Sequence, residues 1–228
     1  SADDFTVISG ILYAADHGAD VINMSLGGYL TRTSPFDLAV ADLMQRAVDY
    51  ATQRGVLVVA AAGNESVNTN AARSPTGSYT DSLHTPAGGL LHVMSVGATG
   101  PVDQKKFDQI ADYSNFGDAD VAVFAPGGNT VDTAETSDLV LGACSAAFLP
   151  VCATENRYLL GAGTSFASPL VAGEAAVIKS HAQTKPTAAQ LEACVLNTAF
   201  KVNGVRPDTA YGFGRIDVLS GVLSSSCQ

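Results

Sequence analysis

The chain has 228 residues and a formal net charge of −10, and it is 46% hydrophobic and 15% charged. This length suits one α/β domain with a sizeable core. The acidic balance argues against nucleic-acid binding, which needs a positive face, but it suits a secreted or otherwise extracytoplasmic protein. No apolar run of eighteen residues predicts a membrane span.

Helical and strand patterns alternate along the chain. In order, the apolar residues predict a helix over 5–17, a strand over 20–24, a helix over 34–53, strands over 55–62, 90–98 and 120–125, and helices over 164–183 and 187–197. This order predicts an α/β fold with a mostly parallel sheet covered on both faces. A sheet of four short strands leaves hydrophobic edges open, so we expect an upstream segment or another chain to complete it.

Four cysteines are present, at positions 144, 152, 194 and 227. None forms a CxxC pair, which argues against a zinc site, and the even number fits two disulfides. The spacing favours Cys144–Cys152, closing a small loop, and Cys194–Cys227, tying the C-terminus to a helix. Three pairings are open, and so is the alternative of four reduced, buried thiols.

The segment 161–169, GAGTSFASP, brings Ser165 to the start of a long apolar helix. Backbone N–H groups are unpaired at a helix start, and the helix dipole is positive there, so an oxyanion beside Ser165 would be stabilised. Pro169 is expected in the first helical turn, where its missing N–H costs little. A serine or threonine helix cap is the competing interpretation.

This segment, continued as GTSFASPLVAG over 163–173, resembles the nucleophile motif of the subtilisin-like serine peptidases. Further segments match the same family in the same order, at 21–28, 59–65, 113–117, 125–127 and 211–217. The resemblance implies that residues 1–228 are the C-terminal portion of one subtilisin-like domain. It also implies a three-layer α/β/α fold that is incomplete without an N-terminal segment.

By that resemblance Ser165 is the nucleophile, and Asn64 and the Ser165 backbone N–H are the oxyanion donors. The resemblance implies that an exposed edge pairs with the substrate backbone, formed by Ser25, Leu26, Gly27 and Gly28. It implies one wall of the primary specificity pocket from small residues, namely Ala60, Ala61, Ala62 and Gly63. Leu26 and Val7 would line an apolar pocket further along the substrate. Whether Glu65 lies at the edge of the primary pocket or in solvent is left open. A preference for large apolar substrate side chains is expected. A cis Thr85–Pro86 bond is implied as well.

The family's Asp and His motifs should precede Ser165, and neither occurs in this sequence. His17, His84, His92 and His181 are all rejected as the base, because a base must reach its nucleophile within hydrogen-bonding distance. We therefore expect this chain alone to be inactive.

Two hypotheses follow. The first is a serine endopeptidase that hydrolyses peptide or protein substrates through Ser165 acyl-enzyme chemistry, with Asp and His supplied by a separate N-terminal chain. The second is a non-catalytic peptide-binding or structural module of the same fold. The resemblance implies a propeptide inhibitor with a zymogen stage, no cofactor for the chemistry, and structural calcium near 86–92, where Asp120 lies close to the usual ligand position held here by Ala122.

Overall fold

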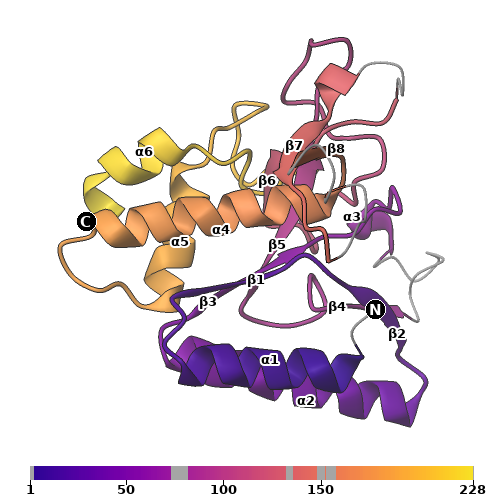
Figure 1. The fold of residues 1–228 in the computed structure, drawn as a ribbon, viewed down its shortest axis with the longest axis vertical. Helices are drawn as coiled ribbons and strands as arrows, with labels where there is room; N and C mark the ends of the chain where they lie inside the picture. The colour runs from indigo at the N-terminus through magenta and orange to yellow at the C-terminus, as the bar shows by residue number, and fades with distance from the viewer. Residues whose placement is uncertain (1–2, 73–81, 132–135, 148–151, 153–157, 228) are drawn as a thin grey trace.

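A four-stranded parallel sheet forms the centre of the computed structural model, which describes residues 3–72, 82–131, 136–147, 152 and 158–227 (Figure 1). The strand order is β1-β3-β5-β6, with every neighbouring pair parallel. The strands are β1 (Val21–Met24), β3 (Leu57–Ala61), β5 (Val93–Thr99) and β6 (Val123–Pro126).

Helices cover both faces of this sheet, as Figure 1 shows. On one face lie α1 (Asp4–Asp16) and α2 (Pro35–Gln53), and on the other lie α4 (Thr164–His181), α5 (Ala188–Thr198) and α6 (Val218–Leu223). The expected three-layer α/β/α arrangement is confirmed. No helix within the described ranges is long and apolar enough to cross a membrane.

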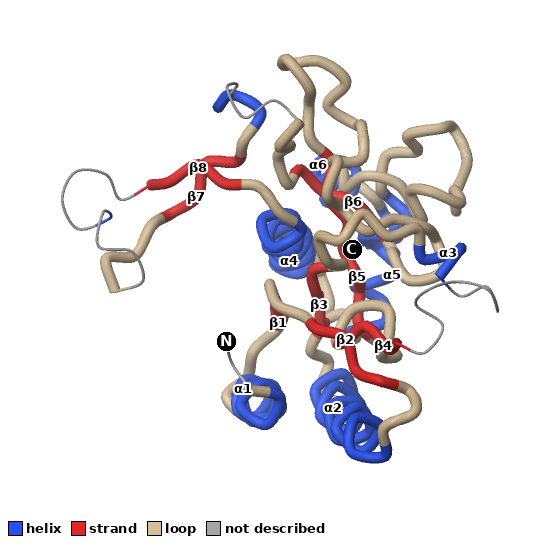
Figure 2. Tube along the Cα trace, turned by 90° about the vertical axis from the view of Figure 1, so that its right-hand side faces the viewer, coloured by secondary structure: helices blue, strands red, loops and turns tan. Residues whose placement is uncertain are grey.

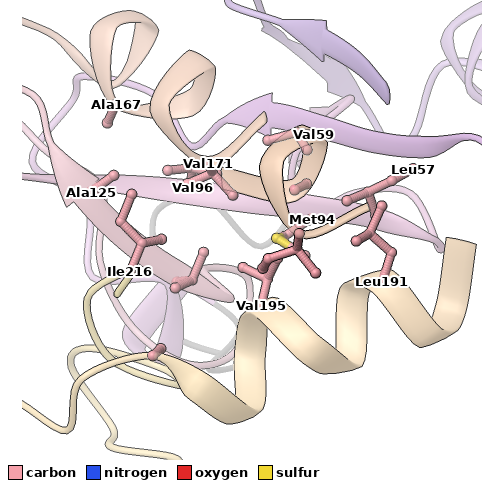
Figure 3. Packing of buried hydrophobic residues seen from close by; sticks show 14 of the residues in the cluster. Leu57, Val59, Met94, Val96, Ala125, Ala167, Val171, Leu191, Val195 and Ile216 are labelled. Atoms are coloured by element: carbon pink, nitrogen blue, oxygen red, sulfur yellow. The ribbon is translucent and has the colours of Figure 1, made fainter. Parts of the chain in front are cut away.

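The alternation of side chains along β3 divides the core into two layers. Leu57 and Val59 pack with α4 and α5, whereas Val58 and Ala60 pack with α1 and α2. All four side chains are at most 1% exposed, which explains why the sequence shows a continuous apolar run here. Figure 3 shows the first layer, in which Met94 and Val195 meet between β5 and α5.

Two smaller antiparallel sheets escape the sequence prediction. One pairs β2 (Gly28–Thr31) with β4 (Ser82–Thr85), and the other pairs β7 (Val140–Ala143) with β8 (Tyr158–Gly161). Figure 2 shows β7 and β8 standing apart from the main sheet. The remaining short elements are α3 (Thr69–Ala72), η1 (Thr136–Asp138) and η3 (Ser225–Cys227).

The predicted helices and strands of the main layers are all present, with boundaries shifted by up to three residues. Both favoured disulfides are also formed, Cys144–Cys152 and Cys194–Cys227, and the Thr85–Pro86 bond is cis. The expectation for Pro169 is wrong. Because α4 begins at Thr164, Pro169 lies inside the helix, past the first turn.

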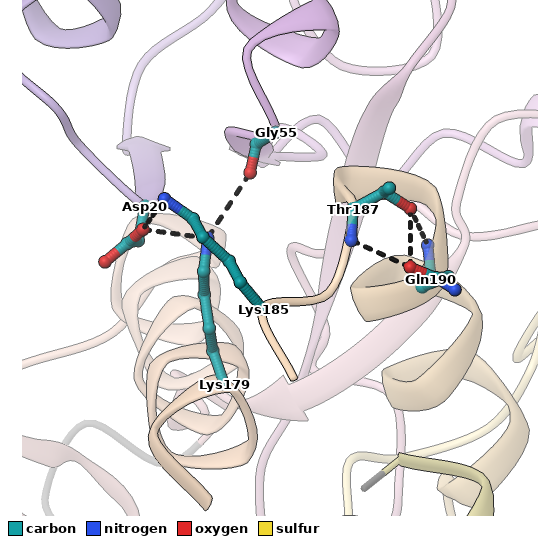
Figure 4. Close-up of polar contacts among 6 residues, drawn as sticks. All are labelled: Asp20, Gly55, Lys179, Lys185, Thr187 and Gln190. Atoms are coloured by element: carbon teal, nitrogen blue, oxygen red, sulfur yellow. Dashed lines mark hydrogen bonds and ion pairs between the residues drawn. The ribbon is translucent and has the colours of Figure 1, made fainter. Parts of the chain in front are cut away.

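Polar contacts fix the far end of α4 against the start of β1 (Figure 4). Lys179 Nζ lies 2.8 Å from Asp20 Oδ1 and donates to the Gly55 carbonyl at 3.4 Å. The Lys179 hydrogen bond lowers the pKa of Asp20. Beside them, Thr187 and Gln190 form a capping box that starts α5. These contacts position the helix whose opposite end carries Ser165.

A buried acid lies in the middle of α4. Glu174 is 2% exposed, and neither carboxyl oxygen has a hydrogen-bond partner within the described part of the chain. Burial raises the pKa of Glu174 to about 7, and the negative charge of Asp217 acts in the same direction. The Asp217 backbone N–H opposes this shift without reaching the geometry of a full hydrogen bond.

We predict that Glu174 makes the protein less stable as the pH rises. A carboxyl with a higher pKa when folded binds more protons in the folded state, so the free energy of unfolding falls between pH 4.5 and about 7. The full loss is about 3 kcal/mol. Urea unfolding at pH 5 and pH 8 should show that Glu174→Gln removes this difference, whereas Asp42→Asn on the exposed side of α2 keeps it. An unchanged difference in Glu174→Gln would contradict the prediction.

Candidate active site

Ser165 is the second residue of α4, where backbone N–H groups have no partner within the helix. Its side chain is half-buried, and its hydroxyl donates to the Ser25 carbonyl at 3.3 Å. Ser25 lies just past the carboxyl end of β1. The candidate nucleophile therefore lies at the carboxyl edge of the parallel sheet, the usual position of sites in open α/β folds.

The side chain of Asn64 bonds the start of α4, and the same hydrogen bonds fix the orientation of its amide group. Its Oδ1 accepts from the backbone N–H and the hydroxyl of Thr164, both at 2.9 Å. Since a backbone N–H can only donate, the oxygen of the amide must face Thr164, and Nδ2 faces the other way. Thr164 is fully buried and its Oγ1 also accepts from the Gly63 N–H at 3.2 Å.

The two expected oxyanion donors meet beside Gly163. A Cβ built on Gly163 would lie 3.7 Å from both Asn64 Nδ2 and the Ser165 backbone nitrogen. Gly163 has φ +149°, a conformation that side chains rarely adopt, and its own N–H is bonded to the Gly127 carbonyl and the Tyr113 hydroxyl. Gly163 is thus held open next to two N–H groups that can bind a developing negative charge.

Pro169 and Ser25 are linked through the carbonyl of Ser165. Pro169 has no N–H to donate to the carbonyl four residues earlier, which is that of Ser165. Ser25 Oγ takes the place of this donor at 2.8 Å. Its single proton is used there, so it accepts from Asn23 Nδ2 at 2.9 Å and contacts Ser168 Oγ at 3.1 Å. The strand end is thereby attached directly to the nucleophile's residue.

A cavity of about 390 Å³ opens beside Ser165, and we call it the Ser165 cavity. Its lining includes many of the residues expected to bind substrate: Leu26, Gly27, Gly28, Ala61, Gly63, Asn64 and Ser165. Four others do not line it. Ser25 instead bonds the Ser165 carbonyl from the end of β1. Ala60 and Ala62 are at most 2% exposed within the core, and Val7 packs on the core from α1.

Sequence reasoning missed three residues of the cavity wall, namely Tyr29, His84 and Thr164. Tyr29 and His84 come from β2 and β4, which face each other in antiparallel register. His84 directly precedes the cis Thr85–Pro86 bond, and this was the one sequence signal for the wall.

None of the histidines is bonded to Ser165 within the described residues. His17 and His181 cap the ends of α1 and α4 by bonding Tyr13 and Val177 carbonyls. At 1.5 Å per helical residue, His181 lies about 24 Å from Ser165. His84 lines the cavity but stacks on Tyr29, with ring centroids 4.8 Å apart. The rejection of these three as the base therefore agrees with the geometry.

The expected calcium position has one carboxylate. A Cβ on Gly88 would meet Asp120 Cβ at 2.6 Å, so Asp120 lies against the 86–92 loop. No group of three or more His, Cys, Asp or Glu side chains suited to a metal occurs in the described ranges. A single carboxylate with loop carbonyls is a partial oxygen donor set for Ca²⁺. Calcium binding stays a prediction.

A serine at the start of a buried helix, with two N–H donors converging beside it on an α/β sheet, is the arrangement of a serine peptidase site. Residues 1–214 match the model of the subtilase family, peptidase S8. The chain therefore belongs to the subtilase family of serine peptidases, which are hydrolases.

Individual relatives agree with this assignment. The chain is 34% identical over 216 residues to a thermophilic serine proteinase of Bacillus sp. (strain AK1), covering 95% of this chain and 41% of that protein. It is 34% identical to an extracellular protease of Xanthomonas campestris pv. campestris, covering 86% of this chain and 27% of that protein. A solved lanthipeptide protease matches with a TM-score of 0.80 and 30% identity, over 97% of this chain and 66% of that one. The chain thus spans less than half of the two sequence relatives.

We predict that Ser25 and Pro169 are energetically coupled. Ser25→Ala leaves the Ser165 carbonyl without its donor and should cost about 1 kcal/mol. In a Pro169→Ala background the new N–H can bond the same carbonyl, so the cost should nearly vanish. Urea unfolding of the two single variants and the double variant measures this coupling.

Pro186→Ala, before α5, serves as the control background for this cycle. There Ser25→Ala should keep its full cost, because the two sites share no contact. Equal costs of Ser25→Ala in all three backgrounds would show that Ser25 does not replace the missing N–H.

Proposed function

We propose that this chain is the nucleophile-bearing part of a serine endopeptidase that hydrolyses peptide or protein substrates through an acyl-enzyme on Ser165. Ser165 Oγ attacks the scissile carbonyl, the peptide C–N bond breaks as the amine takes a proton, and water then releases the acyl group. The observation that carries this proposal is the convergence of Asn64 Nδ2 and the Ser165 N–H beside Gly163. Both donors are uncharged and suit an oxyanion.

The segment from Ser25 to Gly28 is the proposed binding edge for the substrate backbone. All four residues are exposed, and they run from the end of β1 into β2 beside Ser165. An extended peptide can add to such an edge through main-chain hydrogen bonds, and the two glycines let it approach closely.

Proton transfer requires groups that the described residues do not bring to Ser165. We propose that a separate N-terminal chain of the same peptidase supplies the Asp and the His, and that this chain alone is inactive. In subtilisin, a member of this family, losing the serine or the histidine costs about 10⁶ in turnover. A propeptide that inhibits a zymogen form fits the same scheme.

Two surfaces support a further segment beside α4. In the described main sheet β1 pairs only with β3, so its other edge presents unpaired backbone groups. On α4, an apolar stripe is exposed, consisting of Pro169, Leu170, Gly173, Ala176 and Val177. Leu170 and Val177 are 41% and 39% exposed. A contiguous apolar face next to an open strand edge is typical of a surface that another segment covers.

An extracytoplasmic location suits both the family and the chain. One relative is named an extracellular protease, and disulfides persist in oxidising compartments.

Ser165→Ala should abolish the hydrolysis of a chromogenic peptide by the complete protein, with a loss of about 10⁵-fold or more. Intact-mass analysis of the same preparation should find the polypeptide that carries the His motif. Equal rates for the two proteins would contradict the endopeptidase and favour the alternative, a non-catalytic peptide-binding or structural module.

Asn64→Asp should lower kcat by about 10²- to 10³-fold, the loss known for this type of donor in subtilisin. The variant keeps the oxygen that binds Thr164 but has no N–H for the oxyanion, so KM and the melting temperature should change little. Asn197→Asp, at the exposed end of α5, is the matched control and should retain full activity. An Asn64→Asp protein with normal kcat would exclude Asn64 as an oxyanion donor.

A further inference from the structure

The wall of the Ser165 cavity formed by β2, β4 and the loop after β3 is polar and aromatic. Tyr29, Glu65 and His84 form this wall together with the small residues Gly27 and Gly28. The sequence suggested a wall of small residues, left the place of Glu65 open, and came with an expected preference for large apolar substrate side chains. Glu65, in the loop after β3, changes that expectation, because it places a carboxylate in the cavity that a substrate side chain would enter.

Glu65 is held in the wall by neutral donors. Its Oε2 accepts from the Tyr29 hydroxyl at 2.9 Å and from Asn115 Nδ2 at 2.7 Å. Gly63 makes room for it, since a Cβ at Gly63 would come within 2.4 Å of Glu65 Oε2 and 2.5 Å of Asn115 Nδ2. Gly63 also has φ +100°, so a side chain there is disfavoured twice. The carboxylate is thus fixed in place.

No cation is paired with this carboxylate among the described residues. The ion pairs between described residues involve Lys179, Lys185, Arg54 and Arg215, and none of them includes Glu65. His84 also lines the cavity, and burial lowers its pKa against the opposing effect of Glu65 and Asp120. The wall therefore presents a carboxylate that a basic ligand can pair with.

The aromatic rings of the wall also favour a basic substrate side chain. Tyr29 and His84 stack with an interplanar angle of 27°, and both line the cavity. A planar guanidinium can lie on such rings while its N–H groups bond a carboxylate. A volume of about 390 Å³ accommodates a long side chain of this type.

The cavity also identifies which substrate residue is recognised. Asn64, Ser165 and Glu65 all line it. The residue whose carbonyl carbon is attacked has its oxygen at the N–H groups of Asn64 and Ser165, so its side chain is the one that enters the cavity. This is the residue immediately before the scissile bond.

We propose that the Ser165 cavity selects a basic side chain, Arg in preference to Lys, at the residue before the scissile bond, with Glu65 as the specificity-determining group and Tyr29 and His84 as its aromatic platform. The inference rests on the proposed function, and it specifies the substrate class for the same site.

The test compares peptide p-nitroanilides that differ only in the residue before the scissile bond, which is Arg, Lys, citrulline, Phe or Glu. Citrulline has nearly the shape of Arg without its charge. With the complete protein, Arg should exceed citrulline in kcat/KM by about 10- to 100-fold, the range of a charge-assisted hydrogen bond. In Glu65→Gln the ratio should fall to near 1, whereas Glu65→Asp should restore part of it.

Asp42→Asn is the control for lost negative charge, because Asp42 is exposed on α2 and does not line the cavity. It should keep the ratio of the unmodified protein. An equal or lower kcat/KM for Arg than for citrulline, or a fastest rate with Phe, would overturn the proposal without use of any variant.

Failure of the proposed function gives a different result, in which no peptide is cleaved. Calorimetric binding then decides the specificity on the same preparation, with product peptides that end in Arg or citrulline. Tighter binding of the Arg peptide that is lost in Glu65→Gln supports the proposal. Equal affinities for the two peptides, or no binding of either, would overturn it.

Discussion

The side chain of Asn64 holds the first residue of α4, and the candidate site depends on that contact. A single amide oxygen accepts both the N–H and the hydroxyl of Thr164, which fixes where the helix begins. The same contact uses the amide oxygen and leaves the amide nitrogen available beside Gly163, where a Cβ would lie 3.7 Å from it and from the Ser165 nitrogen. Helix capping and the orientation of an oxyanion donor are therefore one interaction. Small residues surround it because the backbones of the two loops must approach closely.

The helix that carries Ser165 combines stabilising and destabilising features. Its far end is fixed by Lys179 against Asp20 and Gly55, and one face fills the core with Ala167, Val171 and Ile178. Its middle contains Glu174, a buried acid without a hydrogen-bond partner in the described part of the chain. Pro169 removes an internal hydrogen bond near the nucleophile, and Ser25 replaces it from the neighbouring strand. Such local departures from helix rules are common at functional sites.

Charge in the Ser165 cavity is organised differently from charge on the rest of the surface. Glu65 is fixed by Tyr29 and Asn115, which satisfy one oxygen without cancelling the charge. The carboxylate of Glu65 is therefore left for a cationic ligand to pair with. The apolar stripe on α4 and the open edge of β1 present the opposite chemistry a short way along the same helix, suited to another protein segment. The same helix thus begins at the polar Ser165 cavity and carries the exposed apolar stripe along one face.

The sequence by itself determined the elements of the main sheet and the helices, and it favoured, among three open pairings, the two disulfides that form. The roles expected for Ser165 and Asn64 came from the resemblance to a family. These follow from local periodicity, from cysteine spacing and from the ordered motifs of a family. The sequence predicted the start of α4 at residue 164 correctly but placed Pro169 in the first helical turn, although Pro169 lies five residues past that start. Only the tertiary structure brought Tyr29 and His84 to Glu65, paired Ser25 with Ser165 and moved Ala60, Ala62 and Val7 into the core. These contacts join residues that are distant in the chain, so no local pattern encodes them, and the chemistry of the cavity is decided by folding.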